Sequence, residues 1–352
     1  FECNDTSALY IDDFTLAEAP IIPIQDDIAS IKDVYNGYFK IGTAIMASNL
    51  ASPSFMDLVE KHFNESITFG NELKPDYVLD QAASQASGDN TNPQVNFSQA
   101  DALLKYCGKN KIPVRGHTLV WHSQTPDWFF KENFSDDGDW VDKDTMLKRM
   151  ENYIKNVMEG LATQYPDVEF YAWDVVNEAF TDSGTVRPAG SNNAVNGQSA
   201  WVSVFGDNSF IDYAFEFARK YAPENCKLFY NDYNEYTPAK RDAICEKAKE
   251  LKEKGLIDGI GMQSHLDITD SFHSATNYAK ALEYFRLNCP DLEIQITELD
   301  ATMVSTEDKP LTDEDQAAYY DQIMNAILTN KKNGGNITAL IIWSLYGGVS
   351  WR

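Results

Sequence analysis

Two glutamates end strand-like segments of the chain, WDVVNEAF at 173–180 and ITELD at 296–300, which carry Glu178 and Glu298. If both segments are strands of one parallel barrel, their carboxyl ends lie at the same rim. Two carboxyl groups about 5–5.5 Å apart can cleave a glycosidic bond with retention, one as acid and one as nucleophile. Most of the 54 acidic residues are expected to be solvated surface charges. A carboxylate that ends an apolar run is different, and the pattern predicts that Glu178 and Glu298 are a glycosidase pair.

Three neighbouring side chains could set the two roles apart. Because strand side chains alternate, Glu298 and Asp300 lie on one side, and His265 arrives from the neighbouring strand. We expect Asp300 to orient His265, and His265 to keep Glu298 ionised as the nucleophile. Glu178, in a less charged surrounding, would keep its proton and act as the acid. His265 could equally be a satisfied core histidine, and Asn177 either a donor to a sugar hydroxyl or a strand-end turn residue.

The segment RGHTLVWHSQTPDWFF at 115–130 is rich in side chains that bind sugars. His117 and Gln124 can donate to hydroxyls, and the Trp121 ring can stack on a pyranose face. The alternatives are a core strand followed by an aromatic loop, or a metal site. His117 and His122 are five residues apart without a cysteine or an HExxH motif, so we predict no metal and no cofactor. Near the end of the chain, Trp343 and Trp351 are either core residues or stacking platforms, and the nearby carboxylates favour platforms.

The elements that must position these residues alternate between short β-branched runs and longer segments of helical period. This alternation is typical of repeated βα units. Eight strands are predicted, at 40–45, 67–70, 112–117, 170–176, 227–231, 259–265, 293–298 and 338–344. Helical intervals are predicted at 144–164, 238–254, 275–287 and 313–332. The fold class is therefore α/β, a (β/α)8 TIM barrel, with chemically able residues at the carboxyl ends of its strands.

The two ends of the chain fit the barrel less well. Residues 1–19 alternate like an antiparallel strand and precede a proline-containing linker, so residues 1–23 are interpreted as the remnant of an N-terminal β module. Residues 24–352 form the predicted catalytic barrel, from which the eighth helix is expected to be missing. The polar stretch at 84–93 is expected to be a surface loop.

Composition restricts the partners. At 352 residues, 43% of them apolar, the chain can bury a large core, and its net charge of −25 argues against nucleic acid and against an anionic membrane surface. A neutral partner fits so acidic a surface. The five cysteines are widely spaced and mostly expected to be free and buried, and Phe1 begins no charged-then-apolar leader, so we expect no signal peptide in this chain.

Four segments together resemble the motifs of glycoside hydrolase family 10, the retaining endo-β-1,4-xylanases: RGHTLVWHSQ, WDVVNEAF, GMQSH at 261–265 and ITELD. The resemblance runs from about Ile28 to Arg352. It implies Glu178 as acid/base and Glu298 as nucleophile, with xylan and xylo-oligosaccharides as substrates. On the non-reducing side of the cleaved bond it implies sugar contacts from Asn71, Lys74, His117, Trp121, Trp343 and Trp351. Around the reacting sugar it implies Asn177, Gln124, Gln263 and His265, and on the leaving-group side Tyr230 and Asn231.

The resemblance also implies a location and an appended module. Polymeric xylan cannot enter a cell, so the protein is expected to be secreted or held at the cell surface. The segment YIDDFTLAEA at 10–19 resembles the closing strand of the jelly-roll carbohydrate-binding modules that often precede such barrels.

The chain departs from the family pattern at several positions. Gly70 stands before Asn71 where the family commonly has a glutamate, and the family's Trp-Gly and following Asp become Trp343-Ser344 and Gly347. Gly70 leaves open a β-1,4-glucanase on the same barrel, because extra room there could admit a hydroxymethyl group. A non-catalytic xylan-binding protein is a third reading, which the presence of both glutamates disfavours.

Overall fold

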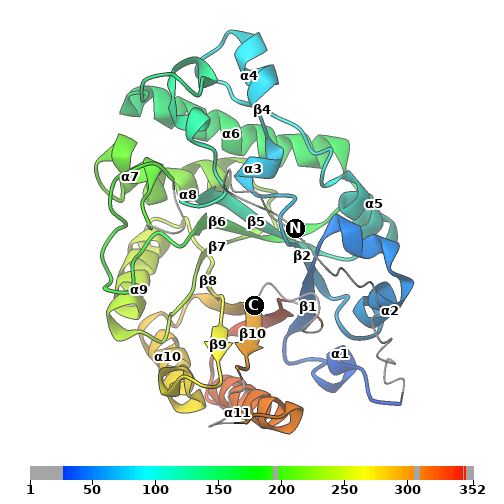
Figure 1. Cartoon of the computed structure of the whole chain (residues 1–352). Coiled ribbons are helices and arrows are strands. Elements are labelled where there is room, and N and C mark those ends of the chain that lie inside the picture. Colours follow the sequence, from blue (N-terminus) through cyan, green and yellow to red (C-terminus); the bar gives the residue numbers. More distant parts are fainter. Residues whose placement is uncertain (1–26, 193–196, 305–309, 344, 346–352) are drawn as a thin grey trace, which may run out of the picture.

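The computed structural model describes residues 27–192, 197–304, 310–343 and 345. Within these residues, eight parallel strands close into a barrel with the helices outside it (Figure 1), which confirms the predicted (β/α)8 fold. The order around the barrel is β11-β1-β2-β5-β6-β7-β8-β10, and pairing of β10 with β11 closes the ring. The strands are β1 (Lys40–Ile45), β2 (Ser66–Phe69), β5 (Val114–Trp121), β6 (Phe170–Asn177), β7 (Lys227–Asp232), β8 (Gly259–Met262), β10 (Glu293–Thr302) and β11 (Ile337–Ile342).

Helices follow or precede most of the barrel strands. The α-helices are α1 (Ile31–Val34), α2 (Pro53–His62), α3 (Pro75–Val78), α4 (Gln81–Ser87), α5 (Asp101–Asn110), α6 (Lys143–Gln164), α7 (Ala200–Phe205), α8 (Ser209–Tyr221), α9 (Pro238–Glu253), α10 (Ala275–Asn288) and α11 (Asp313–Lys332). Short 3-10 turns are η1 (Ala47–Ala51), η2 (Asp127–Phe130), η3 (Glu132–Phe134) and η4 (Ser271–His273). Two further strands, β3 (Leu79–Asp80) and β4 (Gln94–Val95), pair antiparallel, and β9 (His265–Asp267) runs parallel to the end of β10. No helix among the described residues is long and apolar enough to cross a membrane.

Local sequence explains where the helices begin and which face they bury. The Asp142 side chain accepts a hydrogen bond from the Thr145 amide and caps α6, and α11 begins with a reciprocal capping box between Thr312 and Asp315. The buried face of α6 recurs every three or four residues. Its members are Met146, Arg149, Met150, Tyr153, Ile154, Val157, Met158 and Leu161.

The barrel strands are buried on both faces, which explains their nearly continuous apolar sequence. The interior is not purely apolar. Arg115 of β5 forms an ion pair with Asp174 of β6, both almost completely buried, and its Nε donates to Gln295 of β10 over 2.9 Å. The guanidinium also lies over the Phe229 ring, 5.2 Å from its centroid. This paired cation fills the barrel interior below the carboxyl ends of the strands, where Glu178 and Glu298 lie.

Several boundaries differ from the predictions. β5 continues from His117 to Trp121, and the predicted sixth strand ends at Met262, before β9 begins at His265. The first four residues of the predicted loop at 84–93 belong to α4, which ends where Gly88 adopts a φ of +68°. The predicted N-terminal module at 1–23, the expected absence of the eighth helix and Trp351 concern segments outside the described residues.

Candidate active site

A cleft of about 750 Å³ lies at the carboxyl ends of the barrel strands, and both Glu178 and Glu298 line it. It also brings together most of the side chains that the sequence singled out. These are Asn71, Lys74, His117, Trp121, Gln124, Asn177, Gln263, His265 and Trp343. They come from six of the barrel strands or the residues that follow them, namely β2, β5, β6, β8, β10 and β11, so the cleft depends on closure of the barrel.

Glu178 follows the last residue of β6 in a left-handed backbone conformation, with a φ of +55°. Such a conformation is costly for a residue with a side chain and is kept only where the surroundings fix it. The Glu178 amide donates to the Asn231 carbonyl over 2.9 Å, and Arg187 Nε donates to the Glu178 carbonyl. The next amide, of Ala179, donates to the Tyr230 hydroxyl over 2.9 Å. These bonds aim the Glu178 carboxyl group into the cleft.

The Glu178 carboxyl group accepts hydrogen bonds on both oxygens. Trp121 Nε1 donates to Oε2 over 2.9 Å. Gln263 Nε2 donates to Oε1 over 2.9 Å, and Asn177 Nδ2 donates to the same oxygen over 3.2 Å. Arg187 Nη2 lies 4.0 Å from Oε2 and is the nearest cation to this carboxyl group among the described residues. The surrounding therefore consists mainly of neutral donors.

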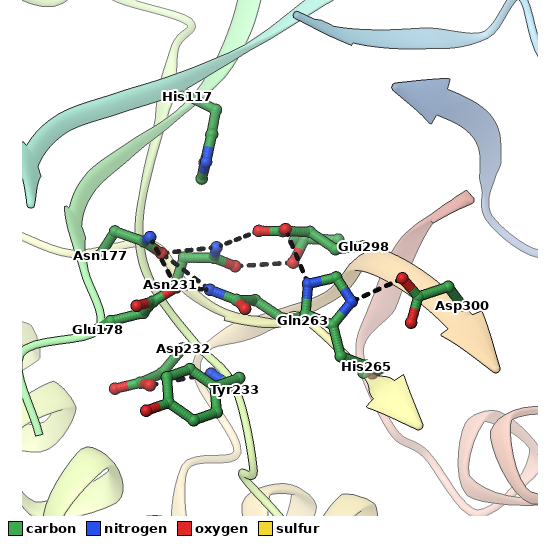
Figure 2. A network of polar contacts seen from close by, with 12 residues as sticks. His117, Asn177, Glu178, Asn231, Asp232, Tyr233, Gln263, His265, Glu298 and Asp300 are labelled. Atoms are coloured by element: carbon green, nitrogen blue, oxygen red, sulfur yellow. Dashed lines mark hydrogen bonds and ion pairs between the residues drawn. The ribbon is translucent and has the colours of Figure 1, made fainter. Parts of the chain in front are cut away.

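Glu298 lies in a more strongly charged surrounding. Its Oε2 is 3.2 Å from His265 Nε2, and His265 Nδ1 is 2.9 Å from Asp300 Oδ2 on the same strand as Glu298. Burial alone would raise the pKa of Glu298, but the His265 hydrogen bond and the nearby His117 and His265 charges lower it to about 2. Burial would lower the pKa of His265, yet its bonds to Asp300 and Glu298 raise it to about 9. At neutral pH the pair is therefore a carboxylate beside an imidazolium. Figure 2 shows the His265 ring between Glu298 and Asp300.

Three amide side chains connect the two carboxyl groups (Figure 2). Asn231 Nδ2 donates to Glu298 Oε1 and to Asn177 Oδ1, each over 2.9 Å. Gln263 Nε2 donates to Asn177 Oδ1 over 3.2 Å in addition to its bond to Glu178. We call Asn177, Asn231 and Gln263 the amide bridge. It fixes the position of each carboxyl group relative to the other.

The shifts of Glu298 and His265 predict a pH-dependent contribution to stability. The lowered pKa of Glu298 contributes stability above about pH 4.5 that is lost as the pH falls through 2. The raised pKa of His265 contributes stability below about pH 6.5 that is lost as the pH rises through 9. His265→Gln should therefore lower stability by on the order of 1.5–3 kcal/mol between pH 4.5 and 6.5, and by less above pH 9. Urea unfolding of both proteins across this range measures it, and a difference independent of pH would contradict the assignment.

A second group of side chains lies on the other side of Glu298. His117 Nδ1 is 2.9 Å from Asp174 Oδ2, which leaves Nε2 as the ring nitrogen toward the cleft. The Trp343 ring lies edge-on to the His117 ring, with 5.7 Å between the two centroids. Lys74 Nζ donates to Asn71 Oδ1 over 2.9 Å and to Gln124 Oε1 over 2.8 Å. Lys74 and His117, with the side chains bonded to them, thus present donors that suit the hydroxyl oxygens of a sugar.

The structure corrects the placement of Tyr230 and Asn231, which were expected to contact the leaving group. Tyr230 is 1% exposed, and its hydroxyl donates to Asp232 Oδ2 over 2.6 Å, behind the cleft wall. Asn231 is completely buried and contacts Glu298 and Asn177. Strand alternation explains both: Tyr230 and Asp232 share the outer face of β7, whereas Asn231 shares the inner face with Tyr233, which lines the cleft.

Other contributing residues were not identified from the sequence. Arg187 lies nine positions after Glu178 in an irregular segment, where no periodicity indicates its direction, and only the fold brings it to Glu178. The sequence does carry a signal for Tyr233, because it directly follows the carboxyl end of β7, where cleft residues are expected. His122, in contrast, is buried outside the cleft lining, and burial lowers its pKa to about 3.

The space beside Gly70 is already occupied. A Cβ atom at Gly70 would come 3.0 Å from Cγ of Met46, which lies in the same cleft wall. Asn71 Nδ2 lies 3.8 Å from the Met46 sulfur. A side chain at position 70 would therefore crowd the Met46 side chain in this wall of the cleft.

Among the described residues, no cluster of three or more histidine, cysteine or acidic side chains could hold a metal ion. The charged groups of the cleft have partners within it: Glu298 pairs with His265, and Lys74 donates to the neutral amides of Asn71 and Gln124. Chemically, the site offers a fixed anion and a second carboxyl group among neutral donors.

Comparison with known proteins identifies the family to which the chain belongs. The profile of Glycosyl hydrolase family 10 matches residues 30–352. The chain is 43% identical to Endo-1,4-beta-xylanase Y of Acetivibrio thermocellus, over 92% of this chain and 30% of that protein. It is 46% identical to the bifunctional endo-1,4-beta-xylanase XylA of Ruminococcus flavefaciens, over 92% of this chain and 31% of that protein.

A solved structure of similar shape contains the CBM22-1 and GH10 modules of a Clostridium thermocellum endo-1,4-beta-D-xylanase complexed with xylohexaose. The TM-score is 0.84 at 42% identity, and the match covers 92% of this chain and 63% of that one. Of the two curated relatives named above, Endo-1,4-beta-xylanase Y and XylA, the chain spans about a third of the length.

Proposed function

Because the chain belongs to glycosyl hydrolase family 10, we propose that it cleaves internal β-1,4-xylosidic bonds of xylan by a retaining double displacement. The observation that carries the proposal is the unequal surrounding of the two carboxyl groups. Glu298 is held ionised by His265, whereas Glu178 is bonded mainly by neutral donors. This asymmetry suits a nucleophile and an acid/base, respectively.

In the first displacement, a Glu298 oxygen attacks the anomeric carbon while the Glu178 carboxyl proton passes to the leaving glycosidic oxygen. The C–O bond to the leaving sugar breaks, and an ester between Glu298 and the sugar forms. In the second displacement, Glu178 removes a proton from water, the water oxygen attacks the anomeric carbon, and the ester breaks. The proton lost in the first step returns to Glu178, and the product keeps the β configuration.

The remaining cleft residues bind the sugars in this proposal. Asn71, Lys74, His117, Trp121 and Trp343 contact the non-reducing side, and Tyr233 takes the leaving-group side instead of Tyr230 and Asn231. Asn177 Nδ2 donates a hydrogen bond to Glu178 Oε1, and in this position it can also donate to a sugar hydroxyl beside the reacting carbon. We also propose that Trp351 stacks on a sugar ring on the non-reducing side.

The partners and location follow from the same chemistry. We propose xylan and xylo-oligosaccharides as substrates, an appended carbohydrate-binding module in the whole protein, and a place outside the cell, where the polymer is. The neighbour with CBM22-1 and GH10 modules supports the appended module. Fractionation of the source cells with detection of the protein tests the location.

Product analysis tests the function. Xylohexaose and cellohexaose are digested side by side, and proton NMR follows the anomer of the new reducing end from the first minutes. We expect fast release of xylobiose and xylotriose with the β anomer first. An α anomer first would mean inversion and overturn Glu298 as nucleophile, and preference for cellohexaose would overturn the assigned substrate.

Met46 provides a prediction about the choice between xylan and glucan. Its side chain lies beside Gly70 in the cleft wall, where we expect it to clash with the hydroxymethyl group of a glucan on the non-reducing side. Met46→Ala should therefore raise the ratio of kcat/KM for cellohexaose to that for xylohexaose by about tenfold, at the lower end of what one or two methylenes can discriminate. The matched variant Gly70→Ala adds bulk at the same place and should lower the ratio. An unchanged ratio in both variants would exclude this wall from substrate choice.

A further inference from the structure

A buried carboxyl group outside the cleft contacts the segment that carries two active-site residues. Gln263 and His265 bond the two catalytic glutamates, and Ser264 lies between them. Ser264 joins β8 to β9 with a φ of +62°, a left-handed conformation that side chains rarely adopt, and it is completely buried. Its conformation decides the directions in which Gln263 and His265 leave the backbone.

The backbone of this segment is held at three points. The Gln263 amide donates to the Asp232 carbonyl over 2.9 Å, and the Ser264 carbonyl accepts from the Asp300 amide over 3.4 Å. Between them, the Ser264 amide donates to Glu235 Oε1 over 3.1 Å. The first two bonds are backbone pairings that any sequence could make. The third depends on a side chain from the loop after β7.

Glu235 is completely buried and lies outside the cleft lining, so it does not reach the sugar directly. Its other oxygen, Oε2, has no hydrogen-bond partner among the described residues. Burial raises the pKa of Glu235 to about 8, although the hydrogen bonds from its own amide and from the Ser264 amide lower it. At neutral pH the group is thus a neutral carboxylic acid that accepts the Ser264 amide on its carbonyl oxygen.

The Ser264 side chain has its own partners. Ser264 Oγ lies 2.7 Å from the Tyr278 hydroxyl and 3.2 Å from the Met262 carbonyl. These bonds fix the side chain, whereas the bond from Glu235 fixes the peptide. The two can therefore be removed separately.

We propose that Glu235 is a positioning residue that holds Ser264 in its left-handed turn and thereby fixes Gln263 on Glu178 and His265 on Glu298. The proposal rests on the catalytic roles assigned above, but the turn and its consequences for His265 can be measured without turnover. Loss of the Glu235 bond leaves a buried amide unpaired and frees the strained turn to relax.

The first measurement is the titration of His265 by NMR in protein labelled with ¹⁵N-histidine, which contains five histidines. Wild-type His265 should titrate near pH 9, because Asp300 and Glu298 stabilise its charged form. Glu235→Ala should move this titration down toward the ordinary value of about 6.5. Glu235→Gln keeps the accepting oxygen and should leave it in place. Tyr278→Phe, which removes only the side-chain partner, is the matched control and should also leave it in place.

The second measurement is hydrolysis of a dinitrophenyl xylobioside by the same variants. Glu235→Ala should lower kcat by about 10- to 100-fold with little change in KM, because a displaced catalytic constellation loses rate more than binding. Glu235→Gln should stay within about twofold. Glu235→Ala combined with Ser264→Gly should recover at least about fivefold over Glu235→Ala, because glycine adopts the left-handed conformation without steric cost.

The outcomes separate the hypotheses. An unchanged His265 titration in folded Glu235→Ala, as judged by near-UV circular dichroism, would overturn the positioning role. So would the absence of recovery in the combined variant. If Glu235→Ala does not fold, Glu235→Asp, whose shorter side chain cannot reach the Ser264 amide, takes its place with the same expected shifts. If no variant hydrolyses a xyloside but the titration shifts as expected, the proposed function fails and the positioning role stands.

Discussion

Glu298→Ala is expected to lower kcat on xylo-oligosaccharides by at least about 10⁴-fold. Removing a nucleophile from a set of residues that act as a unit costs about as much as removing the whole set. No other described carboxylate lies beside the imidazolium of His265 in a position to replace it, because Asp300 contacts the far side of the ring. The variant should still bind the substrate, since the Lys74 and His117 groups are untouched.

Azide provides the decisive test of this variant. With a dinitrophenyl xylobioside, azide can enter the space left by Glu298 and attack the anomeric carbon once, which gives an α-glycosyl azide. Glu293→Gln is the matched control, because Glu293 lies at the opposite end of the same strand and contacts Lys227 and Thr338. Residual activity of Glu298→Ala within tenfold of wild type would remove Glu298 from the nucleophile role.

Glu178→Ala is expected to show a loss that depends on the leaving group. Xylohexaose needs a proton on its leaving oxygen, and general acid catalysis contributes about 10²- to 10⁴-fold, so its kcat/KM should fall by that factor. Dinitrophenolate leaves without a proton, so kcat/KM for its xylobioside should stay near the wild-type value. The same substrate should show a burst followed by slow turnover, because the ester then lacks its general base.

Azide again reports the role, with the opposite result. It attacks the ester on Glu298 in Glu178→Ala and should give a β-glycosyl azide together with faster turnover. Glu169→Ala is the matched control and should behave as wild type, because Glu169 is exposed and lies directly before β6, at the end of this strand opposite to Glu178. An equal loss for both leaving groups would mean that Glu178 contributes through structure rather than as a proton donor.

Much of the fold could be predicted from the sequence because barrel strands carry a strong local signal. β1 and α11 begin and end at the predicted residues, and the other strands differ at their ends. Glu178, Glu298, His265 and Asp300 could be expected at the rim because they stand at the ends of apolar runs, and the structure brings them together. Their position follows from topology alone.

What the sequence could not predict depends on contacts between distant segments. Arg187 and Glu235 lie in irregular segments, and nothing local indicates that one reaches the Glu178 carbonyl and the other the Ser264 amide. The effect of Gly70 required knowledge of Met46, which is 24 residues away. Tyr230 differs for another reason: the alternation of strand side chains places it on the outer face of β7, whereas the resemblance implies a contact in the cleft.

The amide bridge has a consequence for how Glu178 regains its proton in the proposed cycle. Carboxamides donate hydrogen bonds but do not accept and release protons as carboxyl groups do, so the bridge is an insulator in proton transport. The proton on Glu178 cannot be drawn from its partner through Asn177, Asn231 and Gln263, although bonds run the whole way. It must come from the cleft itself. In the proposed cycle the attacking water of the second displacement supplies it, so water has to reach Glu178 once the leaving sugar has departed.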